Sequence, residues 1–337
     1  MTADTPPSSP PPDRWATLRR VAAAAAVAGL LGWVIWRAWF DARRIDWTSL
    51  DLDPGLVALS VMLYGLGFVW HGLVWVWMMR ALGYQLGWLP GLRASALSQL
   101  GNYIPGKVFI VLFRMRVARR YGVPGLPVAG TTALETLLRN ILAALLAAVG
   151  LYHIGAGISY VPALVVIAAV SVVLAHPRVF HALADWALRK LGRPPLPGKL
   201  TGPQVALLLV CYTVYWAVQT YALWLLVAGT LGAEIGDFPA LATAMLAAQI
   251  GSTLAVFAPV GLGAADATLA EVLKLTGGVR APYMVAVIAR VWRTVSEMVQ
   301  IGVVWLIPVR ATEGSNAPDS PDGGAAQQTV RDDGPTR

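Results

Sequence analysis

Residues 126–151, LPVAGTTALETLLRNILAALLAAVGL, decide the fold class of this chain. The run is long enough to cross the hydrocarbon core of a bilayer, which is about 30 Å thick and takes a helix of roughly 20 apolar residues. It also contains Glu135, Arg139 and Asn140. Because a charge at the centre of a span costs about 2.5–3.5 kcal/mol on insertion scales, such residues are rarely accidental. The stretch therefore predicts a membrane-spanning helix with a functional polar face.

Apolar residues dominate the rest of the chain as well. Hydrophobic residues make up 57% of the 337 residues and charged residues only 13%, which leaves too little polar surface for a soluble globule of this size. Four further runs have the length and composition of membrane spans. They are Gly55–Met79, Ile158–Ala175, Val205–Gly229 and Tyr283–Val309. The sequence thus predicts an all-α protein, a polytopic integral membrane helical bundle.

The two ends of the chain differ in composition from this membrane domain. Residues 1–13 and 311–337 are rich in Pro, Ser, Gly and Asp and are expected to be disordered tails. An Ala-rich apolar stretch within residues 14–40 is expected to be a retained first span rather than a cleaved signal. The predicted membrane domain therefore covers residues 14–310.

The basic residues predict the orientation of the chain. The net charge of +8 lies mainly in short loops between apolar runs, which the positive-inside rule explains better than nucleic-acid binding does. The basic loops Arg114–Arg120 and His176–Leu200 are expected to be cytoplasmic, whereas Tyr152–Gly157 and Leu231–Asp237 lack Lys and Arg and are expected to be external. Both termini are then expected in the cytoplasm, with the bundle in the cell membrane.

Two apolar segments, Ala94–Phe113 and Ala240–Leu275, are broken by Gly, Pro and polar residues. Neither can cross the membrane once without contradicting the loop assignments. Each is therefore predicted to be a re-entrant, broken-helix hairpin, the first open to the cytoplasm and the second to the outside. The order span, hairpin, span then occurs in residues 55–151 and again in residues 205–309, which predicts an inverted repeat of the kind found in secondary transporters.

Charged residues cluster on the span that follows each hairpin. Glu135 and Arg139 are i,i+4 neighbours on one span, and Arg293 and Glu297 on the other, where Arg290 shares the face of Glu297. One interpretation is that these are intrahelical ion pairs that only neutralise one another. The alternative is a covered site with an excess of cations, in which Arg side chains bind a phosphate through paired donors.

The breaks within the hairpins supply further candidates. Gln99-Leu-Gly101 in the first hairpin is echoed by Gln249-Ile-Gly251 in the second, and Lys107 has no acidic neighbour in its own segment. Helix N-termini after Pro105-Gly106 and at Gly261-Leu-Gly263 would present backbone N–H groups to a phosphate. The expected site therefore lies between the two breaks.

The first hairpin also carries a motif. The run Ser98-Gln-Leu-Gly-Asn-Tyr-Ile-Pro-Gly-Lys107, followed by Arg114, resembles the signature of the lysylphosphatidylglycerol synthase/flippase transmembrane family. The Gly-x-Tyr-x-Pro-Gly-Lys pattern of that family is complete here. Its residues are Gly101, Tyr103, Pro105, Gly106 and Lys107.

A second family element is similar to Phe257-Ala-Pro-Val-Gly-Leu-Gly-Ala-Ala-Asp266. In this chain Val260 replaces a glycine of the family pattern, and Asp266 stands where glutamate is usual. The resemblance extends from about residue 60 to residue 309. It implies a membrane domain that moves aminoacylated or other anionic lipids between leaflets.

The expected function is that of a flippase for an anionic or aminoacylated phospholipid, acting without a cofactor or bound metal. Fused family members add a domain that transfers lysine to phosphatidylglycerol; about 28 residues follow Val309 here, so a separate synthase is the expected partner. The expected substrate-binding residues are Gln99, Tyr103, Pro105, Gly106, Lys107, Arg114, Glu135, Arg139, Gln249, Gly261, Gly263, Asp266, Arg290, Arg293 and Glu297.

Three alternatives remain open at this point. The first is a flippase for polyprenyl-phosphate-linked sugars. The second is a membrane enzyme acting on such lipids, with Glu135, Asp266 or Glu297 as general base. The third is an accessory subunit that binds a separate lipid synthase or glycosyltransferase through His176–Leu200.

Overall fold

The computed structural model describes residues 43, 48, 52–103, 108–155, 158–234, 237–255, 261–277, 279 and 281–307. Within these ranges every regular element is a helix, and no strand occurs, which confirms the predicted all-α class. The predicted tails at residues 1–13 and 311–337 and the predicted first span within residues 14–40 lie outside the described residues.

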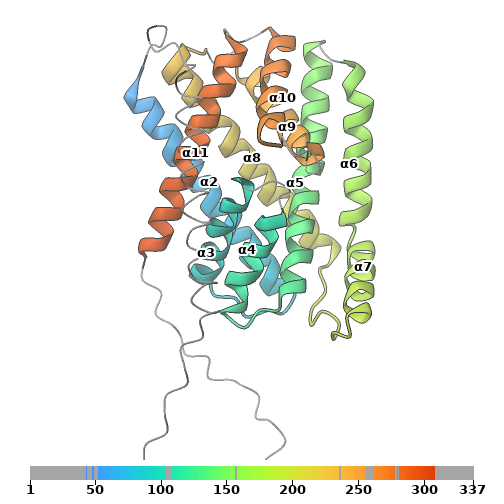
Figure 1. The fold of residues 1–337 in the computed structure, drawn as a ribbon. Helices are drawn as coiled ribbons and strands as arrows, with labels where there is room; N and C mark the ends of the chain where they lie inside the picture. The colour runs from blue at the N-terminus through green and yellow to red at the C-terminus, as the bar shows by residue number, and fades with distance from the viewer. Residues whose placement is uncertain are drawn as a thin grey trace, which may run out of the picture. The chain divides into compact units, whose positions relative to one another are not determined.

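Four helices are long and apolar enough to cross a membrane (Figure 1). They match four of the predicted spans to within a few residues at each end. They are α2 (Pro54–Ala81), α5 (Gly125–Ile154), α6 (Val161–Ala175) with the 3-10 turn η3 (Ile158–Tyr160) before it, and α8 (Gly202–Leu231). The protein is therefore a membrane protein with several spanning helices.

The fifth predicted span is α11 (Pro282–Leu306). Its 25 residues give a helix of about 37 Å at 1.5 Å per residue, which is long enough to cross a bilayer. However, Arg290, Arg293 and Glu297 interrupt its apolar composition. The helix packs against α10, α3 and α2, so protein rather than lipid covers much of this side.

Each of the two broken segments forms a pair of short helices. The first consists of α3 (Trp88–Ser98), the 3-10 turn η2 (Gln99–Tyr103) and α4 (Val108–Arg119). The second consists of α9 (Phe238–Leu254) and α10 (Gly261–Thr276), and the two members of each pair pack together. In Figure 1 the α3–α4 pair lies in the lower part of the bundle and the α9–α10 pair in the upper part.

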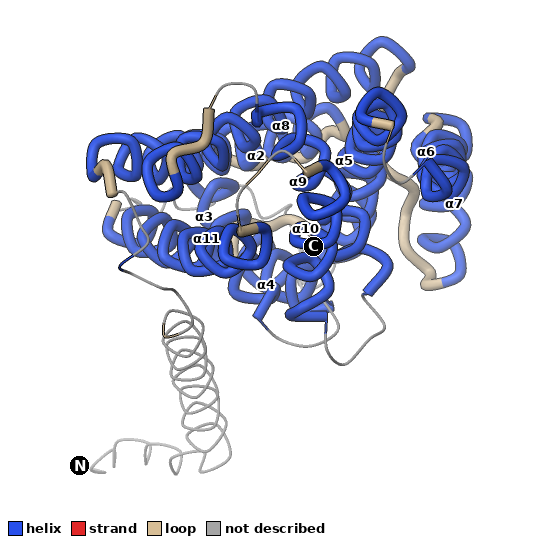
Figure 2. Tube along the Cα trace, turned by 90° about the horizontal axis from the view of Figure 1, so that it is seen from above, coloured by secondary structure: helices blue, strands red, loops and turns tan. Residues whose placement is uncertain are grey.

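Contacts between the two halves are reciprocal. Helix α5 packs on α9, and α11, its counterpart in the second half, packs on α3. Helices α2 and α8, the first of each half, pack on one another and lie side by side in Figure 2. This pattern is what two halves related by an approximate two-fold axis produce. The re-entrant path and the inverted orientation remain predictions.

Two glycines at matching places allow the members of each pair to approach closely. A Cβ atom on Gly101 would collide with the backbone of Ile110 in α4, and one on Gly251 would collide with the Thr268 side chain in α10. Backbone cannot move aside as a side chain can, so the first contact is the stricter one. These glycines belong to the Gln-x-Gly echo found in the sequence.

The expected loop Arg114–Arg120 was assigned wrongly, because α4 continues to Arg119. The apolar run before Arg114 is followed by Arg, Met and Ala, all good helix formers, so nothing ends the helix at the first arginine. The turn comes only at Gly122, which has a positive φ of 76°. Arg114 therefore lies inside the bundle, where its side chain is 1% exposed.

The expected loop His176–Leu200 is also partly helical, since α7 spans Pro177–Lys190. Proline at the first helical position favours this start. The helix is amphipathic: Phe180 and Leu188 are buried, whereas Arg189 and Lys190 are exposed. It packs against α5 and α6, and the backbone N–H of Leu200 donates to His181 Nε2 at 2.8 Å.

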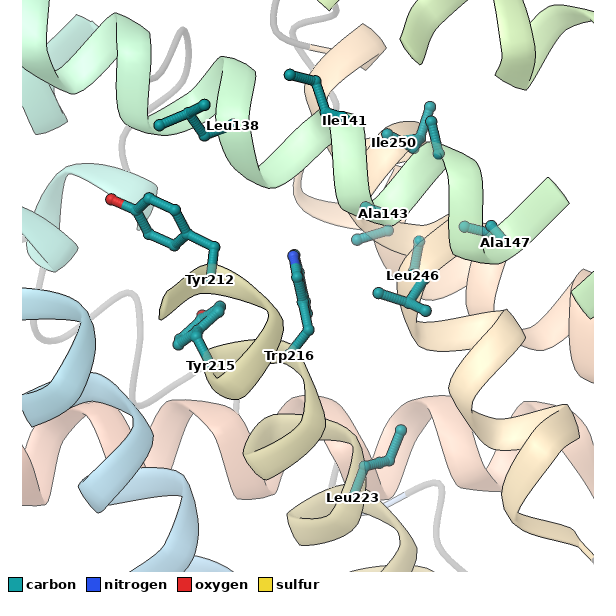
Figure 3. Packing of buried hydrophobic residues seen from close by; sticks show 14 of the residues in the cluster. Leu138, Ile141, Ala143, Ala147, Tyr212, Tyr215, Trp216, Leu223, Leu246 and Ile250 are labelled. Atoms are coloured by element: carbon teal, nitrogen blue, oxygen red, sulfur yellow. The ribbon is translucent and has the colours of Figure 1, made fainter. Parts of the chain in front are cut away.

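The core between the halves is built from α5, α8 and α9 (Figure 3). Tyr212, Tyr215 and Trp216 of α8 are buried beside α5. Further along α5, small residues face α9 and let it approach, and Gly150 lies against Thr243. This packing fixes α5 as the wall that both halves share.

Candidate functional site

A cavity of about 510 Å³ lies between the two halves. Helices α2, α4, α5, α8, α9, α10 and α11 and the turn η2 all contribute to its lining. Among the lining residues that the structure describes, the charged side chains are four arginines and three carboxylates. They are Arg114, Glu135, Arg139, Asp266, Arg290, Arg293 and Glu297. The cavity is thus a charged chamber, and the lining residues that the structure describes carry a small excess of positive charge.

The wall on the α5 side follows from the helical period. Thr132, Glu135, Thr136 and Arg139 are spaced by three, four and seven residues, which places them on one face of an otherwise apolar helix. Glu135 and Arg139 form the expected i,i+4 pair, but at 3.9 Å it is the longest ion pair of this carboxylate. The polar face of α5 therefore serves more than local neutralisation.

The closest partner of Glu135 comes from the first hairpin. Arg114 Nη1 donates to Glu135 Oε2 at 2.6 Å, and His71 Nε2 of α2 lies 2.7 Å from Glu135 Oε1. Arg114 also donates to the Thr132 and Ser95 hydroxyls, both at 3.3 Å. With side chains only 1% and 3% exposed, Arg114 and Glu135 form a desolvated pair in which both carboxylate oxygens have partners, as burial of charge demands. Arg114 Nε has no hydrogen-bond partner among the described residues.

Trp75 completes the surroundings of Arg114. The guanidinium carbon lies 4.6 Å from the centroid of the Trp75 ring, which is within the range of a cation–π contact. The indole nitrogen of Trp75 donates in turn to the Thr131 hydroxyl at 3.2 Å. Helices α2, α4 and α5 are thus joined through one buried network.

The second hairpin has an ion pair of its own. Arg290 Nη1 of α11 donates to Asp266 Oδ2 of α10 at 2.6 Å. The two side chains remain 16% and 18% exposed, because both face the cavity. Nearby on α11, Glu297 accepts a hydrogen bond from the Tyr64 hydroxyl at 3.1 Å. The Asp266–Arg290 pair therefore remains accessible from the chamber, whereas Glu297 is buried.

Neutral polar side chains complete the lining. Asn102 donates to Gln99 at 2.7 Å at the end of the first hairpin's α3 arm. On the other side Gln249 and Thr253 of α9 share the Asn140 amide oxygen at 3.4 Å and 3.3 Å. The two bonds to Asn140 are long for hydrogen bonds. The Gln249 amide and the Thr253 hydroxyl can therefore exchange them for bonds to a ligand.

Most of the residues expected from the sequence meet in this one chamber. The lining includes Gln99, Arg114, Glu135, Arg139, Gln249, Asp266, Arg290, Arg293 and Glu297. Pro105, Gly106 and Lys107 lie outside the described residues, and of Tyr103 only the backbone, at the end of η2, is described. Gly261 and Gly263 belong to the first turn of α10, of which only the backbone is described.

Sequence reasoning missed several partners in the network. His71 of α2 was not among the expected site residues, yet its Nε2 lies 2.7 Å from Glu135 Oε1. Its spacing of seven residues from Tyr64 places both on one face of α2, and that spacing was the available signal. Nothing in the sequence indicated Ser95 or Trp75 as site residues. Both contact Arg114, and those contacts depend on where α4 packs.

Among the residues that the structure describes, no group of three or more His, Cys, Asp or Glu side chains could hold a metal ion. The described lining of the chamber offers arginine, carboxylate, amide and hydroxyl groups. Such groups bind and orient a polar, charged ligand.

The sequence matches the family model described as the lysylphosphatidylglycerol synthase TM region, over residues 20–301. The match covers most of the chain and contains both hairpins and every described residue of the chamber. A search of the curated proteins gives no match.

Proposed function

The chain belongs to the lysylphosphatidylglycerol synthase transmembrane family, and from this we propose that it moves an anionic or aminoacylated phospholipid between membrane leaflets. The family points to a role connected with membrane lipids. Movement of the lipid between leaflets is our own proposal.

One observation carries the proposal: a single charged chamber is shared by both halves. Arginine binds a phosphodiester through two parallel charge-assisted hydrogen bonds, and low exposure to water strengthens them. Arg290 and Arg293 line the chamber on α11, opposite Arg139 on α5. Carboxylates among them suit a headgroup that carries an amine as well as a phosphate.

The two hairpins supply a route to the chamber. Helices α3 and α4 have 11 and 12 residues, so each is about 17–18 Å long and shorter than the hydrocarbon core. Their place at the opposite end of the bundle from α9 and α10 (Figure 1) supports entry from opposite sides. We propose that the hairpins are re-entrant, that the halves are inverted, and that the chamber opens alternately to the two leaflets.

The state of the carboxylates favours transport over catalysis. Both oxygens of Glu135 already have close partners, one in Arg114 and one in His71. Asp266 is paired with Arg290 at 2.6 Å. Because these carboxylate oxygens are engaged in short contacts with arginine and histidine, the groups suit binding and positioning better than proton abstraction.

Leaflet exchange in liposomes tests the proposal. Purified protein should accelerate exchange of a fluorescent phosphatidylglycerol more than that of a phosphatidylcholine with the same chains. Arg290→Ala should slow the exchange at least tenfold, which corresponds to about 1.4 kcal/mol. Arg189→Ala, on the exposed face of α7, is the matched control and should leave the rate unchanged. Exchange at the protein-free rate would refute translocation.

A further inference from the structure

A second cavity lies on the other side of α5, between α5, α6 and α7. Its volume is about 270 Å³, and all the residues that line it have apolar side chains or are glycine. Leu134 and Leu137 of α5 form one wall, and Phe180, Leu183 and Ala187 of α7 form the other. An apolar lining offers water no hydrogen-bond partner, so it favours a hydrocarbon occupant over water.

The two cavities meet at one residue. Ala133 lines the charged chamber and also lines the apolar cavity. Its side chain is exposed although its neighbours Thr132 and Leu134 are buried. Because alanine has only a methyl group, the wall of α5 is thinnest at this point.

Small residues precede Ala133, at the place where the two cavities adjoin. Ala129, one turn before Ala133, lines the charged chamber, and Gly130 lines the apolar cavity. A Cβ atom placed on Gly130 would meet only Phe180, at 3.9 Å. On the N-terminal side of Ala133, the residues of α5 between the two cavities are thus small.

We infer that the apolar cavity is an acyl-chain site for the lipid whose headgroup occupies the charged chamber. The inference rests on the proposed function, because it assigns the two parts of one amphiphile to two adjoining cavities. A headgroup in the chamber keeps its charge among Arg and carboxylate groups. Its chain leaves over Ala133 and lies against α7, where burial of hydrocarbon is favourable. The substrate class is therefore an acyl lipid, rather than a soluble organic phosphate.

Photocrosslinking in liposomes tests this site. Phosphatidylglycerol and phosphatidylcholine carrying the same diazirine-bearing acyl chain are irradiated with the protein, and the labelled peptides are mapped. We expect labels on the cavity-facing residues of α5 and α7, several-fold stronger with phosphatidylglycerol. Ala187→Trp fills the cavity and should reduce both this labelling and the rate of leaflet exchange at least fivefold.

Controls separate filling of the cavity from damage to the fold. Ala182→Trp introduces the same side chain on the exposed face of α7 and should change neither readout. If Ala187→Trp does not fold, Leu183→Trp at the partly exposed rim of the cavity replaces it. Equal labelling by both lipids, or unreduced labelling in a folded Trp variant, would overturn the acyl-chain site.

The two proposals fail in different ways. Headgroup-selective labelling of the cavity without leaflet exchange would refute translocation and leave the acyl-chain site standing. Selective exchange with labels that map away from α5 and α7 would refute the acyl-chain site alone.

Discussion

The two halves tie their hairpins to the following long helix by ion pairs of reversed polarity. In the first half the hairpin supplies Arg114 and the long helix supplies Glu135; in the second the hairpin supplies Asp266 and the long helix supplies Arg290. Both pairs measure 2.6 Å. Their burial differs, because the side chains of the first pair are at most 3% exposed and those of the second 16–18%.

This difference indicates distinct roles for two similar arrangements. His71, Ser95, Thr132 and Trp75 surround the first pair from α2, α3 and α5. The second pair faces the chamber, where an incoming phosphate can compete with Asp266 for Arg290. We therefore expect the first pair to hold the fold and the second to bind the headgroup.

The largest effect on stability is expected at the first pair. Arg114→Ala leaves Glu135 buried beside only a distant Arg139 and a histidine, and should lower the free energy of unfolding by about 3–5 kcal/mol. Thermal unfolding in detergent measures this. The double variant Arg114→Met/Glu135→Leu should recover much of the loss, since no charge is then left buried. A loss under about 1 kcal/mol in Arg114→Ala would remove the distinction between the two pairs.

An intermediate effect is expected at the paired glycines. Gly101→Ala forces a Cβ into the backbone of Ile110 and should cost about 1–3 kcal/mol of unfolding free energy. Gly251→Ala meets only the Thr268 side chain, so its cost should be smaller. Adding Thr268→Ala to Gly251→Ala should restore part of the unfolding free energy that Gly251→Ala loses. Equal costs at both glycines would argue against a stricter contact in the first hairpin.

The smallest effect on stability is expected at the second pair, Asp266–Arg290. Here the main effect is expected on lipid binding. Asp266→Asn should change the free energy of unfolding by about 1 kcal/mol or less, because the pair is accessible from the chamber. It should strengthen binding of phosphatidylglycerol in nanodiscs, whereas Arg290→Ala should weaken it. Changes of the same sign in the two variants would contradict competition between Asp266 and the headgroup.

The sequence was sufficient to predict the helical class, the long helices and most of the charged lining. Length, apolar composition and the cost of intramembrane charge act locally, so Glu135, Arg139 and Arg290 were visible as candidates. The partner of each charge was not visible. Glu135 was matched with Arg139 by helical spacing, whereas docking of α4 brings Arg114 closer, and docking is a tertiary event.

The loop assignments failed for a related reason. A run of arginines after an apolar segment resembles a cytoplasmic loop, yet α4 carries Arg114 into the bundle, where Glu135 compensates its charge. Helix α7 was overlooked within a basic, proline-bounded segment, although its apolar residues Phe180, Leu183 and Ala187 recur at helical spacing. Only its packing against α5 and α6 could not be read from the sequence. A charge pattern locates a basic segment in the sequence, but it does not show which helices that segment packs against.

The proposed transport requires that two hairpins reach one chamber from opposite sides of the membrane. Single cysteines at Asn102 and Ala265, both lining the chamber, test this directly in a Cys211→Ala background with membrane-impermeant maleimides applied from each side. We expect Asn102→Cys to react from the cytoplasmic side and Ala265→Cys from the external side. Reaction of both cysteines from the same side alone would contradict the inverted arrangement.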